Sequence, residues 1–262
     1  MQRTSRLRVY PTEAIALKRQ DFAEADRLIT VLTPNYGKLR LLAKGVRRPT
    51  SRMAGHLEIF AHAHLMVARG RDLDIATQAS TIEPFREVRE DLVASSHAYH
   101  LGELIDAFLE DRDAHPEVFA LFRDALAALA AGAVPPNLVA RHFELNLLGA
   151  VGFRPQLTSC LSCSAEIAPQ SNFYSTTMGG AYCPSCGPRE VSALPIGVDT
   201  LKLLRYLQRS PVVENLAVRP AEPIERDVER LLRRQIEFVI ERRLRAADFV
   251  KRVAEETARY PA

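Results

Sequence analysis

The stretch KLRLLAKG, residues 38–45, decides how the first third of the chain is interpreted. Leu39, Leu41 and Ala43 fall on one face of an extended segment, and the basic residues fall on the other, because side chains alternate along a strand. A period of two predicts a β-strand with one buried side and one side in water. We therefore expect this strand to carry its positive charge on a single exposed face.

Four further segments around this strand are rich in β-branched and other apolar residues, and turn-forming residues separate them. Five strands within about 70 residues fit a small closed barrel, which leaves no unpaired edge. The pattern is compatible with an OB-fold and with an SH3-like barrel, and it does not separate the two. The expected strands cover residues 14–20, 27–33, 38–45, 57–68 and 73–81.

After about residue 85 the apolar residues recur every three or four positions, a spacing that predicts helices. The expected helices lie near residues 92–109, 116–132, 135–152, 197–209 and 223–246. A cysteine-containing segment separates the two helical blocks, so the predicted fold class is a multidomain α+β protein. The expected domains are a five-stranded barrel at 1–82, a helical bundle at 83–155 and 192–262, and a cysteine insertion at 156–191.

Two Cys-x-x-Cys pairs stand at residues 160–163 and 183–186, and nineteen residues separate them. This spacing is typical of a tetrahedral Zn²⁺ site with four thiolate ligands. Such a site leaves no position for water, so we expect one structural zinc ion; a redox or disulfide pair, a site that has lost its metal and an iron–sulfur cluster are the alternatives. The segments 173–176 and 180–182 between the pairs are expected to form a hairpin. The predicted ligands are Cys160, Cys163, Cys183 and Cys186.

Charge is unevenly distributed along the chain, although the net charge is only +3. Residues 1–80 contain 14 Lys and Arg against 7 Asp and Glu, and no acidic residue stands between Arg27 and Glu58. A concentrated cationic face neutralises phosphates and releases counterions, which gives salt-sensitive binding to DNA of any sequence. The alternative is an ordinary solvated strand face. The predicted DNA-binding residues are Lys38, Arg40, Lys44, Arg47, Arg48 and Arg52.

Motifs of catalysis are weak in this sequence. There is no phosphate-binding glycine loop, no nucleophile elbow and no zinc-protease motif. His62 and His64 share a face of an expected strand, an arrangement more typical of a surface pair than of a catalytic metal site. We therefore expect no enzymatic activity, and keep a zinc-dependent nuclease and an adaptor for acidic protein surfaces as alternatives.

Membrane and secreted classes are also disfavoured. The longest apolar run, residues 125–140, has 16 residues and contains two prolines, whereas a membrane span needs about 20. The basic N-terminal stretch is not followed by the apolar segment of a secretory signal. We expect a cytoplasmic protein with no membrane partner.

Several motifs together carry a family resemblance. They are AIALKR at 14–19, EADRL at 24–28, TPNYGK at 33–38, AKGVRR at 43–48, RHFEL at 141–145, GFRP at 152–155 and the glycine pair at 179–180. In this order, over roughly residues 10–205, the sequence resembles the bacterial recombination mediator family RecO.

The resemblance implies an N-terminal OB-fold, a helical domain and a zinc module in a protein of DNA repair and recombination after DNA damage. It implies binding to single- and double-stranded DNA and annealing of complementary strands without ATP or enzymatic turnover. The implied partners are RecR, the C-terminal tail of single-stranded DNA-binding protein and, indirectly, the recombinase RecA at the nucleoid. Some family members lack the cysteines, so the zinc ion is expected to stabilise its own segment.

Overall fold

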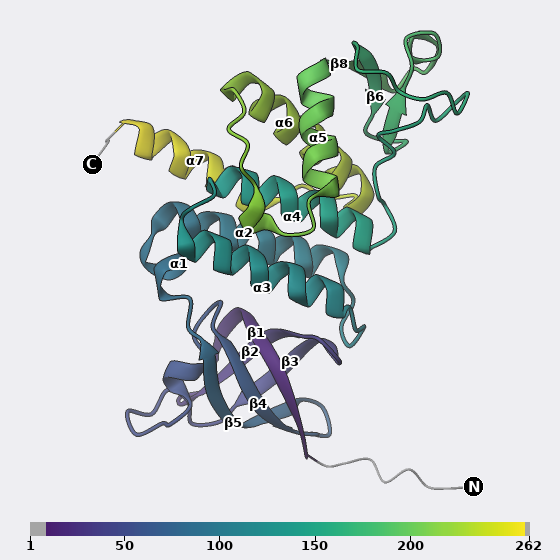
Figure 1. Ribbon diagram of the computed structural model, residues 1–262. Coiled ribbons are helices and arrows are strands. Elements are labelled where there is room, and N and C mark those ends of the chain that lie inside the picture. Colours follow the sequence, from purple (N-terminus) through teal and green to yellow (C-terminus); the bar gives the residue numbers. More distant parts are fainter. Residues whose placement is uncertain (1–8, 260–262) are drawn as a thin grey trace, which may run out of the picture. The chain divides into compact units, whose positions relative to one another are not determined.

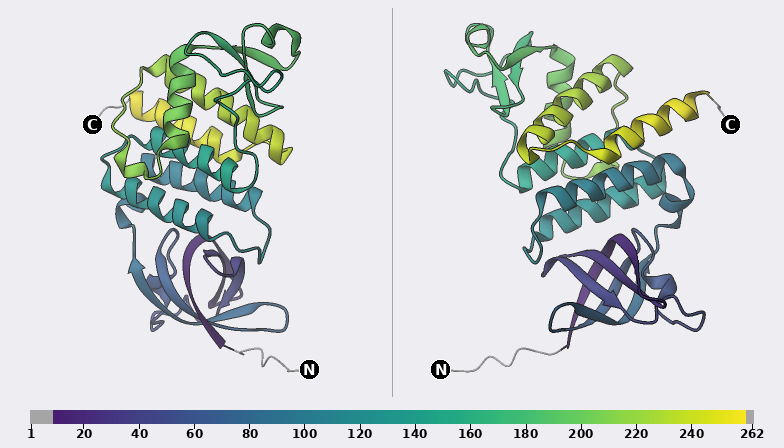
Figure 2. Two further views of the ribbon diagram at one scale, coloured as in Figure 1. Left: turned by 45° about the vertical axis from the view of Figure 1, so that its right-hand side comes forward. Right: turned by 180° about the vertical axis from the view of Figure 1, so that it is seen from behind.

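The computed structural model describes residues 9–259, which form two compact units (Figures 1 and 2). The first unit lies within residues 1–130 and contains a β-barrel followed by helices. The second lies within residues 131–262 and contains four helices and a small sheet. Among the described residues, no helix is both long and apolar enough to cross a membrane. The division expected from the sequence, into 1–82, 83–155 with 192–262, and 156–191, stays a prediction.

The five strands of the first unit close into a barrel in the order β1-β2-β3-β5-β4, and β1 pairs with β4 to complete the ring. The contact between β3 and β5 is parallel, and the other neighbours are antiparallel. This closure is that of an OB-like barrel, so it decides the question that the strand count leaves open. The strands are β1 (Val9–Phe22), β2 (Asp26–Thr33), β3 (Gly37–Ala43), β4 (His62–Ala68) and β5 (Asp74–Glu83).

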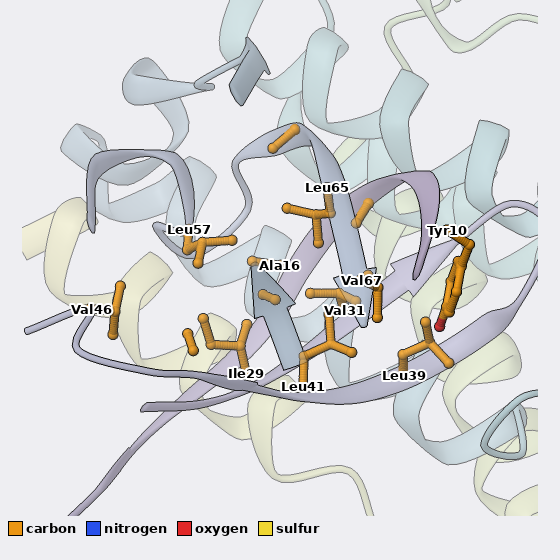
Figure 3. Packing of buried hydrophobic residues seen from close by; sticks show 14 residues of the cluster. Tyr10, Ala16, Ile29, Val31, Leu39, Leu41, Val46, Leu57, Leu65 and Val67 are labelled. Carbon is orange, nitrogen blue, oxygen red and sulfur yellow. The ribbon is translucent and has the colours of Figure 1, made fainter. Parts of the chain in front are cut away.

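Apolar side chains from all around the ring fill the barrel interior; most are aliphatic, and Tyr10 is among them (Figure 3). Ile29 and Val31 of β2 lie beside residues of β3, and Leu39, Leu41 and Ala43 are each 1% exposed or less, so the predicted inward face is confirmed. Burial of one such leucine contributes about 1.5–3 kcal/mol relative to an exposed one. This energy fixes the register of β3, and the alternate residues of the strand must point outward.

The fourth strand begins later than the sequence predicts. A strand over 57–68 is expected, but β4 starts at His62, after a short 3₁₀ helix, η1 (Ala54–His56). The reason is Phe60, which has a φ of +63° and therefore leaves the extended conformation. Its ring is completely buried and lies 4.9 Å from the ring of Tyr99, which explains why the strain is tolerated.

Three helices complete the first unit, and they lie beside the barrel in Figures 1 and 2. Asp91 separates the first two, and its carboxylate accepts a hydrogen bond of 2.6 Å from the backbone N–H of Ala94, as an N-cap residue does. The Phe60 and Phe122 rings meet edge-on at 6.5 Å between their centroids and join the barrel to the third helix. The helices are α1 (Arg86–Glu90), α2 (Leu92–Phe108) and α3 (Pro116–Ala131).

In the second unit, α4, α5 and α6 pack against one another. The prediction of a single helix over 223–246 is wrong, because α6 ends at Ile240 and α7 begins at Arg245. Glu241 has a φ of +53°, which no helix can continue, and the chain turns there. The helices are α4 (Pro136–Ala150), α5 (Val198–Arg209), α6 (Glu222–Ile240) and α7 (Arg245–Arg259), with a short 3₁₀ turn, η3 (Val213–Asn215).

The remaining part of the second unit is a three-stranded sheet of order β7-β6-β8. The predicted hairpin is confirmed as the antiparallel pair β6 and β7, and β8 adds to the free side of β6. The second cysteine pair follows β7 directly, so the hairpin positions these two thiols. The elements are β6 (Asn172–Ser175), β7 (Gly180–Tyr182), η2 (Gly187–Arg189) and β8 (Ala193–Ile196).

Candidate metal centre and nucleic-acid interface

The four cysteines meet in one cluster. Their sulfur atoms all lie within 4.8 Å of one another, and the Sγ atoms of Cys163 and Cys183 are 3.8 Å apart. A tetrahedral zinc ion with Zn–S bonds of about 2.3 Å holds its sulfurs about 3.8 Å apart. Among the described residues this is the one group of three or more Cys, His, Asp or Glu side chains that could hold a metal ion.

Tight turns direct the paired thiols inward. In the first pair, the N–H of Ser164 donates to the carbonyl oxygen of Cys160 at 2.9 Å, and Ser164 takes a φ of +61°. In the second pair, the N–H of Gly187 donates to the carbonyl oxygen of Cys183 at 2.9 Å. A Cβ atom at Gly187 would lie 2.2 Å from the ring of Phe173, so only glycine fits at this turn.

The surroundings of one thiol, that of Cys160, favour the anionic form that metal binding requires. Burial raises the pKa of the Cys160 thiol, but backbone N–H groups of Cys163, Cys183 and Ser162 surround the sulfur and lower its pKa to about 6. The N–H of Cys183 points to this sulfur at 3.4 Å. Such N–H···S contacts are the outer support of thiolate metal sites, so the donor set and its surroundings fit a bound metal ion.

The cysteine segment is attached to α5 through one arginine. The guanidinium of Arg205 donates to the carbonyl oxygen of Leu157 at 2.9 and 2.7 Å, and to that of Ile167 at 2.7 Å. The two carbonyl groups flank the first cysteine pair in the sequence. Charge-assisted hydrogen bonds of this kind hold the irregular backbone in place, independently of any metal.

The second candidate site is the outward face of β3. Arg40 is exposed on this face, Lys44 is exposed directly after the strand ends, and Leu42 lies half-buried between them. In the register of the barrel, Leu42 pairs with Leu28 of β2 on one side and with Ile75 of β5 on the other. An apolar row therefore runs across three strands between two cations.

The loop after β3 continues this basic surface. It turns at Gly45, which has a φ of +63°, and the N–H of Gly45 donates to the Asp26 carboxylate at 2.7 Å. A further backbone hydrogen bond of 3.0 Å joins Arg47 to the turn between β1 and β2. The loop carrying Arg47, Arg48 and Arg52 is thus fixed to the barrel, and the three side chains are exposed.

The same hydrogen bonds bring an acidic residue close to the basic loop, and the sequence did not reveal this contact. Asp21 of β1 accepts from Arg27 at 2.9 Å and lies 3.4 Å from a guanidinium nitrogen of Arg47. The hydrogen bond from Arg27, with the charge of Arg47 nearby, holds the pKa of Asp21 below its usual value. Within the described part of the chain, no ion pair to a carboxylate is formed by four of the six predicted residues, Arg40, Lys44, Arg48 and Arg52.

Lys38 stands apart from the other predicted DNA-binding residues. Its side chain is only 8% exposed, and its Nζ atom lies 3.0 Å from the carboxylate of Asp106 on α2 and 3.5 Å from that of Asp111. Burial alone would raise the pKa of Asp106, but hydrogen bonds from Lys18 and Lys38 hold it below its usual value. In this structure Lys38 therefore joins the barrel to the helices and does not present its charge to solvent.

The two histidines singled out from the sequence do lie on one face of β4, but they differ in environment. His62 is buried, and its Nε2 atom lies 3.0 Å from a carboxylate oxygen of Glu13, whereas His64 is exposed. Burial lowers the pKa of His62, and Glu13 opposes this shift only in part. Within the described residues, these two histidines belong to no group of three or more side chains that could hold a metal ion.

Two known protein families match the sequence over most of its length. Residues 7–85 match the family described as "Recombination protein O N terminal", and residues 89–248 match "Recombination protein O C terminal". The chain belongs to the RecO family. The first match covers the barrel, and the second covers α2 to α6 together with the cysteine cluster. This RecO-family chain is a DNA repair protein.

Individual RecO proteins are similar in sequence to this chain along nearly its whole length. The DNA repair protein RecO of Roseiflexus sp. (strain RS-1) is 41% identical over 248 residues, which are 95% of this chain and 87% of the relative. The DNA repair protein RecO of Dehalococcoides mccartyi is 33% identical over 237 residues, or 90% of this chain and 93% of the relative. That of Desulforamulus reducens is 33% identical over 247 residues, or 94% and 96%. The RecO resemblance drawn from the sequence motifs is therefore confirmed.

Proposed function

We propose that this RecO-family protein is a non-enzymatic recombination mediator, which binds single- and double-stranded DNA and anneals complementary strands without ATP. The observation that carries the proposal is the exposed basic surface of β3 and the following loop, here called the barrel surface and defined by Arg40, Lys44, Arg47, Arg48 and Arg52. Lys38 is left out of it, because its charge is already neutralised.

The phosphate backbones of two DNA strands repel each other. Two strands that approach each other must overcome this repulsion, and fixed cations on a rigid barrel lower it without forming or breaking a covalent bond. The guanidinium and ammonium groups of the barrel surface contact phosphates, which are the same at every sequence. The apolar row of Leu28, Leu42 and Ile75 offers contact to sugars and bases but no hydrogen bonds to base edges.

The test is a comparison of charge variants with equal net charge. In Arg40→Glu/Arg48→Glu, single-strand affinity should fall, and the salt dependence should weaken by about 1.4 in log–log slope for two lost phosphate contacts. The annealing rate of complementary oligonucleotides, without nucleotide, should fall in parallel. In the control Arg86→Glu/Arg209→Glu, two exposed arginines outside the barrel surface change by the same charge, and single-strand affinity should stay within twofold. An unchanged salt slope in the barrel variant would refute the proposal.

For the metal, we propose one Zn²⁺ ion held by Cys160, Cys163, Cys183 and Cys186. The support is the sulfur spacing and the donor set, since four thiolates prefer zinc among common cellular metals in a tetrahedral site. With four protein ligands the ion leaves no open position, so its role is to stabilise residues 156–191. Elemental analysis of the purified protein should give one zinc per chain, and an iron signal with visible absorption would overturn the assignment.

The family also suggests partners. We propose RecR, the C-terminal tail of single-stranded DNA-binding protein and, through loading onto protected single strands, RecA, with the protein acting in the cytoplasm at the nucleoid. Co-sedimentation of the purified proteins tests each contact separately.

The absence of enzymatic turnover belongs to the same proposal, and labelled DNA incubated with divalent metal should stay intact. Cleavage that His62→Ala/His64→Ala abolishes would favour the nuclease alternative instead.

A further inference from the structure

A groove of about 600 Å³ on the second unit is not used by the barrel surface or by the cysteine cluster. Three segments line it, namely the chain after α4, the turn between β6 and β7, and the last turns of α6. Three large apolar side chains of the groove are about half exposed to solvent: Phe153 is 51% exposed, Phe238 is 53% exposed and Met178 is 60% exposed. Two phenyl faces and a thioether in one groove are an unusual apolar exposure for a folded unit.

The groove is rigidly built. Gly152, with a φ of +88°, ends α4, and the N–H of Phe153 donates back to the carbonyl oxygen of Leu148 at 2.7 Å, as in a Schellman motif. At the floor, the almost fully buried side chain of Gln235 accepts a hydrogen bond from the hydroxyl of Tyr174. The aromatic rings are therefore presented by fixed backbone rather than by a loose loop, so little ordering is needed on binding.

Charge around the groove is mixed, with exposed cations available. Arg154 lines the groove, and Arg234 precedes Phe238 by one turn of α6, so the two share a helix face. Glu237 is neutralised by an arginine of its own helix at 3.1 Å. Glu241 is the remaining acidic residue of the lining. A ligand held here must gain from apolar contact as well as from charge.

We infer that this groove is a second binding site for single-stranded nucleic acid, in which bases stack on Phe153 and Phe238 and the backbone lies toward Arg154 and Arg234. Aromatic faces beside arginines are the recurrent means of holding unpaired bases, because every base has a π-face and every nucleotide has a phosphate. A duplex hides its base faces inside the stack, so the groove discriminates single strands from duplexes, which the barrel surface does not.

The inference rests on the proposed function and extends it. Annealing requires that unpaired bases remain accessible while the backbones are neutralised. A second site on a separate compact unit, where stacking adds to charge, allows one chain to hold single strands at two places. The two sites also differ in salt response, since stacking is much less screened than phosphate contact.

The experiment uses the full-length protein and three DNA probes of equal length: oligo(dT), the corresponding abasic strand and a duplex. Wild-type protein should bind oligo(dT) at least about fivefold more tightly than the abasic strand, as expected for one stacked base. Phe153→Ala/Phe238→Ala should lose this preference and keep its duplex affinity. The matched control is Leu194→Ala/Val212→Ala, which removes two similarly exposed apolar side chains of the same unit and should behave as wild type.

The unfolding midpoints of wild type and of both variants are compared first. Wild-type protein is also photocrosslinked to an oligonucleotide carrying 5-iodouracil, so that the result does not depend on the variants alone. Crosslinks on peptides containing Phe153 or Phe238 support the inference. Equal binding of the oligo(dT) and abasic strands by wild type, or crosslinks confined to the barrel, would overturn it while leaving the proposed function intact. If Phe153→Ala/Phe238→Ala lost binding to a synthetic acidic peptide and kept its DNA binding unchanged, the groove would be assigned to a protein partner. This result would also overturn the inference.

Discussion

Replacement of Lys38 by methionine separates structural cations from DNA-binding ones on a single strand. Lys38 and Arg40 are two residues apart on the same face of β3, yet Lys38 is 8% exposed and lies 3.0 Å from Asp106, whereas Arg40 is exposed. Loss of one partner from a buried ion pair typically costs about 3–5 kcal/mol. Asp106 retains Lys18 at 2.6 Å, and this exposed pair limits the damage, so Lys38→Met should cost about 2 kcal/mol.

This loss corresponds to a fall of about 4–8 °C in the unfolding temperature of the first unit. Lys38→Met should at the same time leave single-strand affinity within twofold of wild type. Arg40→Met should do the opposite, with unchanged stability and weaker, less salt-dependent binding. The assays are differential scanning fluorimetry and fluorescence anisotropy across a salt series. If Lys38→Met weakened DNA binding as much as Arg40→Met and left stability unchanged, the assignment of Lys38 to the contact between barrel and helices would fail.

The same pair predicts a pH dependence. The pKa of Asp106 is held below its usual value of about 3.9 in the folded protein, so its contribution to stability is present above that pH and is lost as the pH falls through the folded value. Lys38→Met removes part of this contribution. The difference in stability between wild type and variant should therefore shrink under acid, and a difference that grew below pH 4 would contradict the ion-pair assignment.

Three further changes test other parts of the structure. Cys183→Ser should abolish the proposed zinc binding and make residues 156–191 sensitive to limited proteolysis, whereas the barrel should unfold at its usual temperature; full metal content by elemental analysis would contradict the proposed ligands. Gly37→Ala should destabilise the first unit by more than about 2 kcal/mol in urea unfolding, since Gly37 has a φ of +66° and a Cβ there would lie 2.0 Å from the carbonyl oxygen of Asp113. Phe60→Ala should cost about 3–5 kcal/mol, because the ring is completely buried; a loss below 1 kcal/mol in the same assay would show that the site collapses around the smaller side chain.

Alternation along β3 predicted the inward face, and with it the outward direction of Arg40 and Lys44. The same pattern also placed Lys38 among the exposed cations, because its partners lie at positions 106 and 111, far along the chain. Pairing over such a distance depends on how helices pack on the barrel, and no local periodicity reports it. The contact between Asp21 and Arg47 was invisible for a similar reason, since it depends on the turn at Gly45.

Local backbone geometry accounts for the remaining differences. Phe60 and Glu241 both adopt positive φ values, and neither is a residue type that usually does so. Apolar patterns continue through both positions, so the sequence predicted a longer strand and a longer helix. The cysteine cluster, in contrast, was predictable to the residue. Its ligand spacing is fixed by the chemistry of one ion and hardly depends on the rest of the fold.

The apolar row on the outer barrel wall has a consequence for where such a protein can work. Leu28, Leu42 and Ile75 present only methyl and methylene groups, so any nucleotide that rests there meets the same surface. Lesions arise at unpredictable positions in a chromosome, and a repair factor that bound only one base sequence would reach few of them. A surface that does not distinguish between bases would let one protein act at any position in the chromosome.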